Sequence, residues 1–500
     1  MALNDVKEIS VNPYATDVLV VGAGPTGLAL GIDLARRGVD ALVVERADAL
    51  FPGSRGKGLQ PRTMEVFDDL GVLDAILAAG GTYPVAMIWR DGRRAGEHRM
   101  FDPVEDPGPG TPYREPWMVP QWRTQEILYA RLTELGGRVD FGREVVGLEQ
   151  DEDGVSVRFA AGPDVRAAHV VAADGGRSAV RRALGIGMTG ETVDPHPVLV
   201  ADVRVTGLGR DFWHMFPGNG DGDGDGNGGG AKGEGGEGFL ALCPLAGTDE
   251  FQLAAQFPDG TGPDLSLDGV RKVVAARTHL APEDVTEVRW ASDFRPRAAL
   301  ADRFREGRVL LAGDAAHVHS PAGGQGLNTS VQDAYNLGWK LGAVLRDGAP
   351  PALLDTYEEE RRGNAARMLG LSTGVHRGEV RRGRATQQLD LGYRESTLTS
   401  ETRPAVTGVR AGDRAPDGTV DGVRLFDAFR GPHWTLLGPD APELGPWSRT
   451  VRGPAPEHYG PGLFLVRPDG YVGWAGATAA GLTDYLARVG IGRSGPDRTV

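Results

Sequence analysis

The fold is decided by residues 17–27, which read DVLVVGAGPTG. The first five residues are a short apolar run bounded by glycine, which is typical of a buried strand. A GxGxxG pattern follows at once, and residues 28–37 then favour a helix that ends at a glycine. Residues 41–44 (ALVV) predict a second strand. The segment therefore predicts a complete βαβ unit.

Each glycine of the pattern has its own role in a dinucleotide site. Gly22 makes the tight turn, Gly24 lets the backbone approach a pyrophosphate, and Gly27 lets helix and strand pack closely. The helix N-terminus attracts the phosphates. Glu45 lies 18 residues beyond Gly27 and can accept hydrogen bonds from a ribose hydroxyl pair. Because an acid would repel a 2′-phosphate, the unit predicts FAD or NAD rather than NADP.

Later motifs distinguish these two cofactors. Residues 173–178 (ADGGRS) and 313–317 (GDAAH) each follow a predicted strand, and residues 55–65 (RGKGLQPRTME) and 321–328 (PAGGQGLN) add two further segments. Together with the first motif they resemble the group A flavoprotein aromatic hydroxylases, the para-hydroxybenzoate hydroxylase-like family. The phenol and polyketide hydroxylases of that family are the most similar. The resemblance covers roughly residues 14–370.

The resemblance implies an α/β fold: a Rossmann-like FAD-binding domain with an inserted antiparallel β-sheet substrate domain and a C-terminal thioredoxin-like domain. Residues 412–417 (GDRAPD) and 463–470 (LFLVRPDG) resemble that last domain. The expected boundaries are 14–86, 121–197 and 291–375 for the FAD-binding domain, 87–120 and 198–290 for the substrate domain, 376–410 for a linker and 411–500 for the thioredoxin-like domain. Many of the 75 glycines lie in a low-complexity loop at 218–238.

The resemblance also assigns residues to FAD. The family aspartate that matches Asp314 binds the ribityl chain or the pyrophosphate side, although a helix cap is the alternative. Asp174 is linked to pyrophosphate and nicotinamide use, with a structural turn as the alternative. Arg46 and Arg55 match positions near the phosphates, and the backbone of residues 326–328 would meet the isoalloxazine. The implied cofactor-binding residues are Gly22, Gly24, Pro25, Thr26, Gly27, Glu45, Arg46, Arg55, Gln125, Val145, Asp174, Gly313, Asp314, Gly326, Leu327 and Asn328.

The substrate would lie under the inserted sheet and residues 87–120. An apolar pocket with a few polar groups suits an aromatic ring, although each apolar residue there is more often simply core. Pro321 matches the proline beside the reactive C4a edge of the flavin, and it is the candidate catalytic position. His317 we interpret as a packing residue rather than a general base. The candidate wall residues are Met87, Trp89, Trp213, Met215, Phe216, Phe239, Leu242, Cys243 and Pro321.

The activity that the resemblance implies is a monooxygenase reaction. NADPH or NADH would reduce FAD, and O₂ would form a flavin C4a-hydroperoxide that hydroxylates an electron-rich phenolic or polyketide ring. Two alternatives stay open. One is Baeyer–Villiger oxygenation or epoxidation on the same fold, and the other is a non-catalytic FAD-binding protein. Halogenation is disfavoured, because the WxWxIP motif of the tryptophan halogenases is absent.

Composition narrows the partners. The chain has 500 residues and a net charge of −14, which disfavours nucleic acid and anionic membranes as partners. Cys243 is the single cysteine, so a disulfide framework is excluded, and no metal is expected. Residues 223–234 match an EF-hand expression, but no helices are predicted beside them. Without a signal peptide or an apolar run of ~18 residues, we expect a cytoplasmic protein with a small-molecule substrate. A homo-oligomer is compatible with the sequence.

Overall fold

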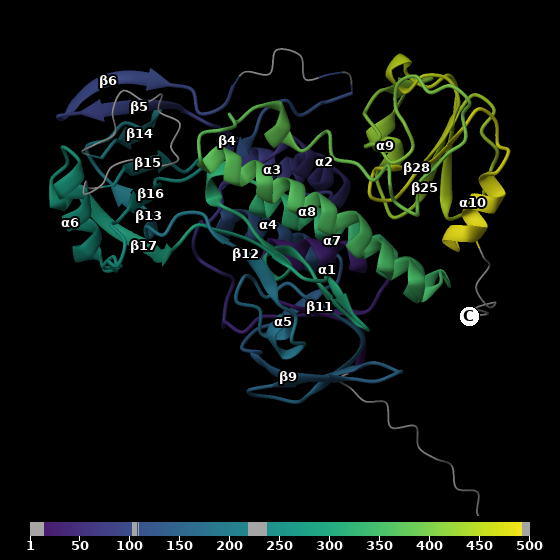
Figure 1. The fold of residues 1–500 in the computed structure, drawn as a ribbon, viewed down its shortest axis with the longest axis horizontal. Coiled ribbons are helices and arrows are strands. Elements are labelled where there is room, and N and C mark those ends of the chain that lie inside the picture. Colours follow the sequence, from purple (N-terminus) through teal and green to yellow (C-terminus); the bar gives the residue numbers. More distant parts are fainter. Residues whose placement is uncertain (1–14, 103–107, 109, 219–237, 493–500) are drawn as a thin grey trace, which may run out of the picture.

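The fold was analysed in a computed structural model, which describes residues 15–102, 108, 110–218 and 238–492 (Figure 1). Its centre is an eight-stranded sheet in which β8, β2, β1, β11 and β20 are parallel neighbours, with β19 antiparallel at one edge. β10 and β9 extend β11 as antiparallel strands. The strands are β1 (Ala15–Val21), β2 (Ala41–Val44), β8 (Arg138–Asp140), β9 (Val145–Gln150), β10 (Val155–Phe159), β11 (Val165–Ala172), β19 (Arg305–Glu306) and β20 (Val309–Leu311).

Helices pack against this sheet and against one another. α1 is buried along most of its length, and a Cβ added to Gly338 of α7 would lie 2.9 Å from Cγ of Asp33 in α1. The glycine therefore lets these two helices approach closely enough to bury Asp33, which pairs with Arg36 and Arg37. The helices are α1 (Pro25–Ala35), α2 (Pro61–Leu70), α3 (Leu73–Ala79), α4 (Gln121–Glu134), α5 (Ala179–Ala183), α7 (Gly326–Arg346) and α8 (Asp355–His376).

A seven-stranded sheet lies at the opposite end of the molecule from the C-terminal sheet (Figure 1). Its order is β17-β13-β16-β15-β14-β5-β6, and α6 (Leu267–Arg277) packs on one face. All neighbours are antiparallel except β14 and β5, which are parallel, so the inserted sheet is mixed rather than purely antiparallel. The strands are β5 (Val85–Arg90), β6 (Arg93–His98), β13 (Val198–Val205), β14 (Phe212–Phe216), β15 (Leu240–Pro244), β16 (Phe251–Gln256) and β17 (Val285–Phe294).

Small sheets connect these parts. Of the expected 218–238 loop, residues 219–237 lie outside the described residues, and so do the EF-hand-like residues 223–234. In the part of the chain that the structure describes, no helix is both long and apolar enough to cross a membrane. The short strands are β3 (Gly58–Leu59), β4 (Gly81–Thr82), β7 (Trp117–Met118), β12 (Met188–Thr192), β18 (Arg297–Ala301), β21 (His317–Val318), β23 (Thr419–Val420) and β24 (Val423–Arg424).

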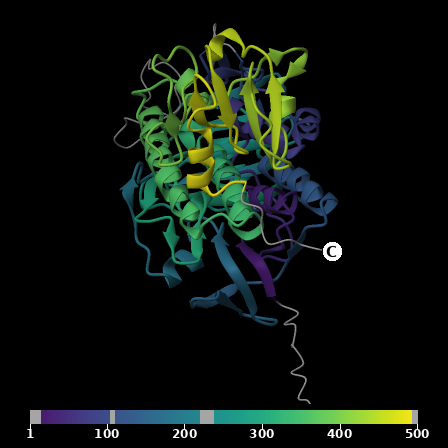
Figure 2. The same cartoon turned by 90° about the vertical axis from the view of Figure 1, so that its right-hand side faces the viewer.

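The C-terminal part forms its own five-stranded sheet, seen face-on in Figure 2, in the order β22-β28-β27-β25-β26. The apolar runs at 434–437 and 463–466 form two of its strands. The expected linker is not a free tether, because Gln387, Leu391 and Tyr393 are buried. The elements are β22 (Ser400–Glu401), β25 (Trp434–Gly438), β26 (Ser448–Arg452), β27 (Leu463–Val466), β28 (Val472–Gly476), α9 (Leu425–Phe429) and α10 (Leu482–Val489).

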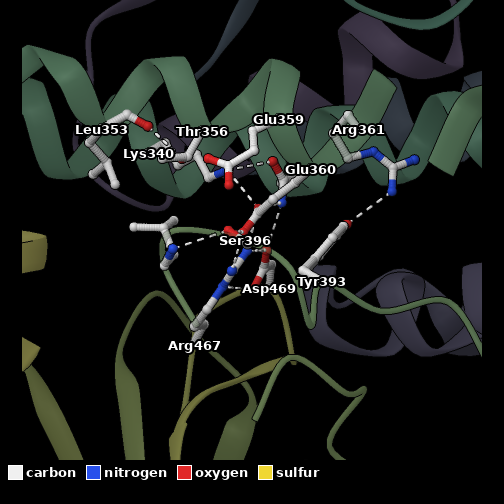
Figure 3. A network of polar contacts seen from close by, with 12 residues as sticks. Lys340, Leu353, Thr356, Glu359, Glu360, Arg361, Tyr393, Ser396, Arg467 and Asp469 are labelled. Atoms are coloured by element: carbon white, nitrogen blue, oxygen red, sulfur yellow. Dashed lines mark hydrogen bonds and ion pairs between the residues drawn. The ribbon is translucent and has the colours of Figure 1, made fainter. Parts of the chain in front are cut away.

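A buried ionic network fastens this sheet to α7 and α8 (Figure 3). Arg467 donates both terminal nitrogens to Glu360 of α8, at 2.6 and 2.9 Å, and its Nε donates to Asp469 at 2.9 Å. Nζ of Lys340 in α7 lies 2.7 Å from Glu360. Burial acts to raise the pKa of Glu360, but Arg467 and Lys340 outweigh it and hold that pKa below the ordinary value. Glu360 is therefore ionised between two cations.

We expect Glu360→Gln to lower the free energy of unfolding by about 3–5 kcal/mol, because it leaves buried cations without their carboxylate. Urea unfolding followed by tryptophan fluorescence measures the loss, since Trp339 and Trp434 pack together beside the network. The control is Glu126→Gln, which removes an exposed ion pair with Arg123 and should cost about 0–1 kcal/mol. Equal losses in the two variants would contradict the importance of the network.

Candidate cofactor and substrate site

The three glycine-containing motifs meet where the parallel strands end. Gly22 donates its N–H to the carbonyl of Val44 at 2.7 Å, and a Cβ at Gly22 would lie 2.8 Å from the carbonyl carbon of Ala173. A Cβ at Gly313 would lie 2.6 Å from Oγ1 of Thr26. The first motif therefore contacts both later ones, although the sequence separates them by more than a hundred residues.

Two of the three motif glycines are required by the protein itself. Gly22 has φ +108°, a conformation that a side chain disfavours, and a Cβ at Gly27 would overlap the carbonyl oxygen of Gly22. A Cβ at Gly24 would meet no atom of the described residues within 4 Å, and its φ of −71° suits any residue. The open space over Gly24, at the start of α1, fits the close approach of a pyrophosphate.

The carboxylate of Glu45 lies directly after β2. Its Oε2 accepts from the N–H of Ala23 and its Oε1 from the N–H of Ala47, both at 3.0 Å. The carboxylate is half-buried and still has lone pairs for two further donors. Arg143 donates its N–H to the carbonyl of Glu45, so Val145, at the start of β9, lies close to the same end of the site.

Charges gather around Asp314. The residue is exposed, although nearby protein atoms still hinder the solvation of its charge. These surroundings raise its pKa, while the charges of His317 and Arg55 lower it. Burial lowers the pKa of Arg55, Asp314 raises it, and Arg177 and Arg46 lower it. Arg55 near this carboxylate, with Arg46 and Arg177 near Arg55, forms a donor set that suits a diphosphate beside a hydroxylated chain.

Asp174 has one oxygen with partners and one without. Oδ2 accepts from the N–H groups of Ala179 and Val180 at 2.7 and 3.2 Å, which caps α5. Oδ1 is buried and has no hydrogen-bond partner among the described residues. Gln125 is fully buried, and its amide donates to the carbonyl of Phe51 at 3.0 Å. It therefore supports the loop that carries Arg55.

The start of α7 is tied to the loop before α2. Asn328 is buried, accepts from the N–H of Gln60 at 2.8 Å, and donates to the carbonyls of Gly58 and Gly324 at 2.9 and 2.8 Å. Gly326 and Leu327 beside it are partly exposed, and Pro321 is exposed. The first N–H groups of α7 have no side-chain cap, which leaves donors for a carbonyl edge.

His317 is fully buried behind this loop. Its Nε2 lies 2.6 Å from Oδ2 of Asp333, and Oδ1 of the same carboxylate accepts from Nε of Arg361 at 2.8 Å. Burial tends to raise the pKa of Asp333, but these two partners lower it to about 2. Asp333 also accepts from the N–H of Gly313 at 3.0 Å. This arrangement fits the predicted structural role of His317.

The residues present fit FAD. Gly24 offers backbone access, Glu45 offers acceptors that suit a ribose, and Asp314 with Arg55 offers groups that suit the ribityl and diphosphate part. The buried unpaired oxygen of Asp174 is the sign of a missing donor, because a buried carboxylate oxygen is rarely left unpaired.

The candidate wall residues divide between the two faces of the seven-stranded sheet. Phe216 and Leu242 lie in the core between the sheet and α6, and Trp89 packs against that core. Nε1 of Trp89 donates to His214, and the strand register pairs Met87 with His214 on this same face. Since strand residues alternate between faces, these four residues belong to the α6 side, and we withdraw them as wall candidates.

The opposite face, which we call the inner face, keeps the other wall candidates. Trp213 and Met215 alternate with the α6-facing residues of β14 and are partly exposed. Cys243 is buried, with Sγ 3.9 Å from Sδ of Met118 in strand β7. Phe239 directly precedes β15 and is partly exposed.

Four residues of the inner face do not follow from sequence reasoning. Tyr83 lies 4.9 Å from Phe101 and 6.2 Å from Trp213, measured between ring centroids. Nζ of Lys57 lies 4.6 Å from the Trp213 centroid, and the Arg382 guanidinium lies 6.0 Å from that of Phe101. We call the four residues together with Trp213 the inner-face cluster: Tyr83, Phe101, Trp213, Lys57 and Arg382. Each of the five is partly exposed. Lys57 belongs to segment 55–65, which carries the family resemblance. No sequence pattern marks Arg382 as a site residue, because it lies in the expected linker.

Comparisons with known proteins identify the family. The sequence profile of the family described as "FAD binding domain" matches residues 15–372. A "Flavin-dependent monooxygenase" of Mycobacteroides abscessus is 46% identical over 94% of this chain and 99% of its own length. A "12-dehydrotetracycline 5-monooxygenase/anhydrotetracycline 6-monooxygenase" of Streptomyces rimosus is 36% identical over 94% and 98%. A solved ternary complex of "aklavinone-11 hydroxylase with FAD and aklavinone" superposes with a TM-score of 0.78, at 30% identity and 96% and 99% coverage.

We expect Gly24→Ala to weaken FAD retention at least about ten-fold while the fold is kept, because the new methyl enters only the space of the ligand. The flavin-to-protein absorbance ratio of the purified protein measures retention, and circular dichroism measures folding. Gly370→Ala in α8 is the control, since its Cβ would also meet nothing within 4 Å in the part of the chain that the structure describes. Full flavin content in Gly24→Ala would refute the assignment of this turn to the pyrophosphate.

Proposed function

Because the chain belongs to the FAD binding domain family and is a FAD-dependent monooxygenase, we propose that it hydroxylates a polycyclic phenolic substrate of the aromatic polyketide type. NAD(P)H and O₂ are the co-substrates of this enzyme class. The observation that carries the proposal is the inner-face cluster, which presents three aromatic rings beside the loop that leads to α7. Offset or tilted ring contacts of this kind favour a flat aromatic ligand.

The cofactor residues would act by position. Gly24 and the start of α1 would hold the pyrophosphate, and Glu45 would hold the ribose of the adenosine. Asp314 would bind the ribityl chain, with Arg55 near the phosphates. Bound FAD supplies the oxygen-activating redox chemistry, which no side chain can provide. The protein therefore contributes binding, orientation and the exclusion of water.

Residues of the expected linker would close the site. Nε of Arg382 donates to the carbonyl of Ala322 at 2.8 Å, directly after Pro321, and Asp102 donates its N–H to the carbonyl of Arg382 at 2.8 Å. Arg382 thus links the loop at Pro321 to the aromatic rings of the inner-face cluster. A substrate ring held between them would be oriented toward the flavin, and water would have little access to the reacting atoms.

The relatives support this substrate class by their names. They include an anhydrotetracycline monooxygenase and an aklavinone hydroxylase. We extend polycyclic aromatic chemistry to this chain as a proposal, together with a cytoplasmic location. The homo-oligomer considered from the sequence stays a prediction, as do the domain boundaries.

We expect the purified protein to be yellow, and a hydroxyanthraquinone to stimulate its oxidation of NADPH or NADH. Under ¹⁸O₂ the product should gain one labelled oxygen as a new ring hydroxyl, detected by mass spectrometry and NMR. Unlabelled O₂ with H₂¹⁸O is the control and should give no label. A ring-expanded lactone would indicate Baeyer–Villiger oxygenation instead. Bound FAD without stimulated NAD(P)H oxidation by any phenol or polyketide tested would contradict the proposal.

A further inference from the structure

Three consecutive residues of one loop lead from the cofactor to the inner face. Arg55 interacts with Asp314 at the predicted diphosphate end. Gly56 follows, and a Cβ there would lie 3.6 Å from Cδ1 of Leu327, at the start of α7. The next side chain, Lys57, lies over the ring of Trp213 on β14. Gly56 thus lies beside the predicted isoalloxazine position, and Lys57, the next residue in the chain, lies on the substrate side of it.

Lys57 has unused hydrogen-bonding capacity. Within the described residues its Nζ donates to Oε1 of Gln252, and its remaining contact is with the face of the Trp213 ring. An ammonium has three N–H donors, so two are left. The indole N–H of Trp213 is also buried and has no acceptor among the residues described. Two neighbouring side chains thus offer donors that the protein does not satisfy.

We propose that Lys57 binds an anionic oxygen of the substrate, a phenolate or an enolate, with the N–H of Trp213 as a second donor. Charge-assisted N–H···O⁻ bonds are stronger than neutral ones, so the pair would select an ionised hydroxyl over its neutral form or its ether. This inference rests on the proposed function, because it names the substrate group that the inner face recognises.

The charges that face Lys57 are consistent with anion binding. Burial lowers its pKa, Cys243 and Asp202 raise it, and Arg382 lowers it. Burial raises the pKa of the Cys243 thiol to about 11, so the thiol is neutral near pH 7. Burial also raises the pKa of Asp202 to about 7, so this carboxyl is only partly ionised there. Lys57 and Arg382 thus bring two basic side chains to the inner face, although the whole chain carries −14.

The proton balance sets the pH dependence. The substrate O–H bond breaks in solution, its electron pair stays on oxygen, and the proton goes to solvent before the anion binds. Affinity should rise with pH as the substrate hydroxyl ionises, and it should fall again when Lys57 loses its own proton. A ring that carries an oxyanion is richer in electrons, so the same contact would favour attack by an electrophilic oxygen.

The test uses the FAD-bound enzyme and two probes, 2-hydroxyanthraquinone and 2-methoxyanthraquinone, titrated by visible difference spectroscopy from pH 6 to 10. We expect the wild type to bind the hydroxyl probe at least about ten-fold more tightly than the ether once that hydroxyl is ionised. Lys57→Gln and Lys57→Met should lose this preference, and Lys57→Arg should keep part of it. Lys272→Gln is the matched control, because Lys272 is an exposed residue of α6, and this variant should behave as the wild type.

The remaining outcomes overturn the inference in different ways. An unchanged preference in Lys57→Gln, or equal affinity of the wild type for both probes, would remove Lys57 from substrate recognition and leave the proposed function intact. Loss of FAD from both neutral variants would make Lys57 a cofactor-positioning residue instead. If the wild type binds neither probe and neither stimulates NAD(P)H oxidation, the inference and the proposed substrate class both fail.

Discussion

The buried carboxylate of Asp333 is the constraint on which the site depends most. It accepts from the backbone of Gly313, from His317 and from Arg361, and it has no exposed surface. Each acceptor contact fixes a different segment: the turn that carries Asp314, strand β21, and helix α8. Because a buried ion is stable only when its partners are all in place, these segments must be positioned together. The geometry of the cofactor end is therefore set by a residue that we do not expect to touch the cofactor.

The same principle extends to the C-terminal sheet. Arg361 donates to the hydroxyl of Tyr393, in the stretch that the sequence suggested as a linker, and Glu360 beside it holds Arg467. Two adjacent residues of α8 therefore make different connections. Arg361 contacts Asp333, which holds the turn at Gly313, and Glu360 contacts Arg467 of the last sheet. The last sheet is integrated into the enzyme through α8 rather than appended to it.

The sequence predicted well what local patterns can encode. The order of strand, glycine turn, helix and strand around Gly22 follows from apolar runs bounded by glycines. Glu45 was selected as a site residue by its distance along the chain from Gly27. The substrate side is different, because strand register decides which face a residue occupies. Trp213 and Phe216 are three residues apart on one strand and point to opposite faces, and no spacing rule shows which face meets the cofactor domain. The place of Arg382 in the site could not be predicted, because its partners, Ala322 and Phe101, are distant in sequence.

The loop at Arg55, Gly56 and Lys57 has an evolutionary consequence. In our proposal its three residues serve the diphosphate, the packing against Leu327 and the inner face in succession, so their order along the chain matters as much as their identity. Substitutions at position 57 could alter which molecules are accepted while the cofactor remains bound. A single-codon insertion or deletion would shift all three roles at once. Diversification of this enzyme at that loop should therefore proceed by residue replacement at constant length.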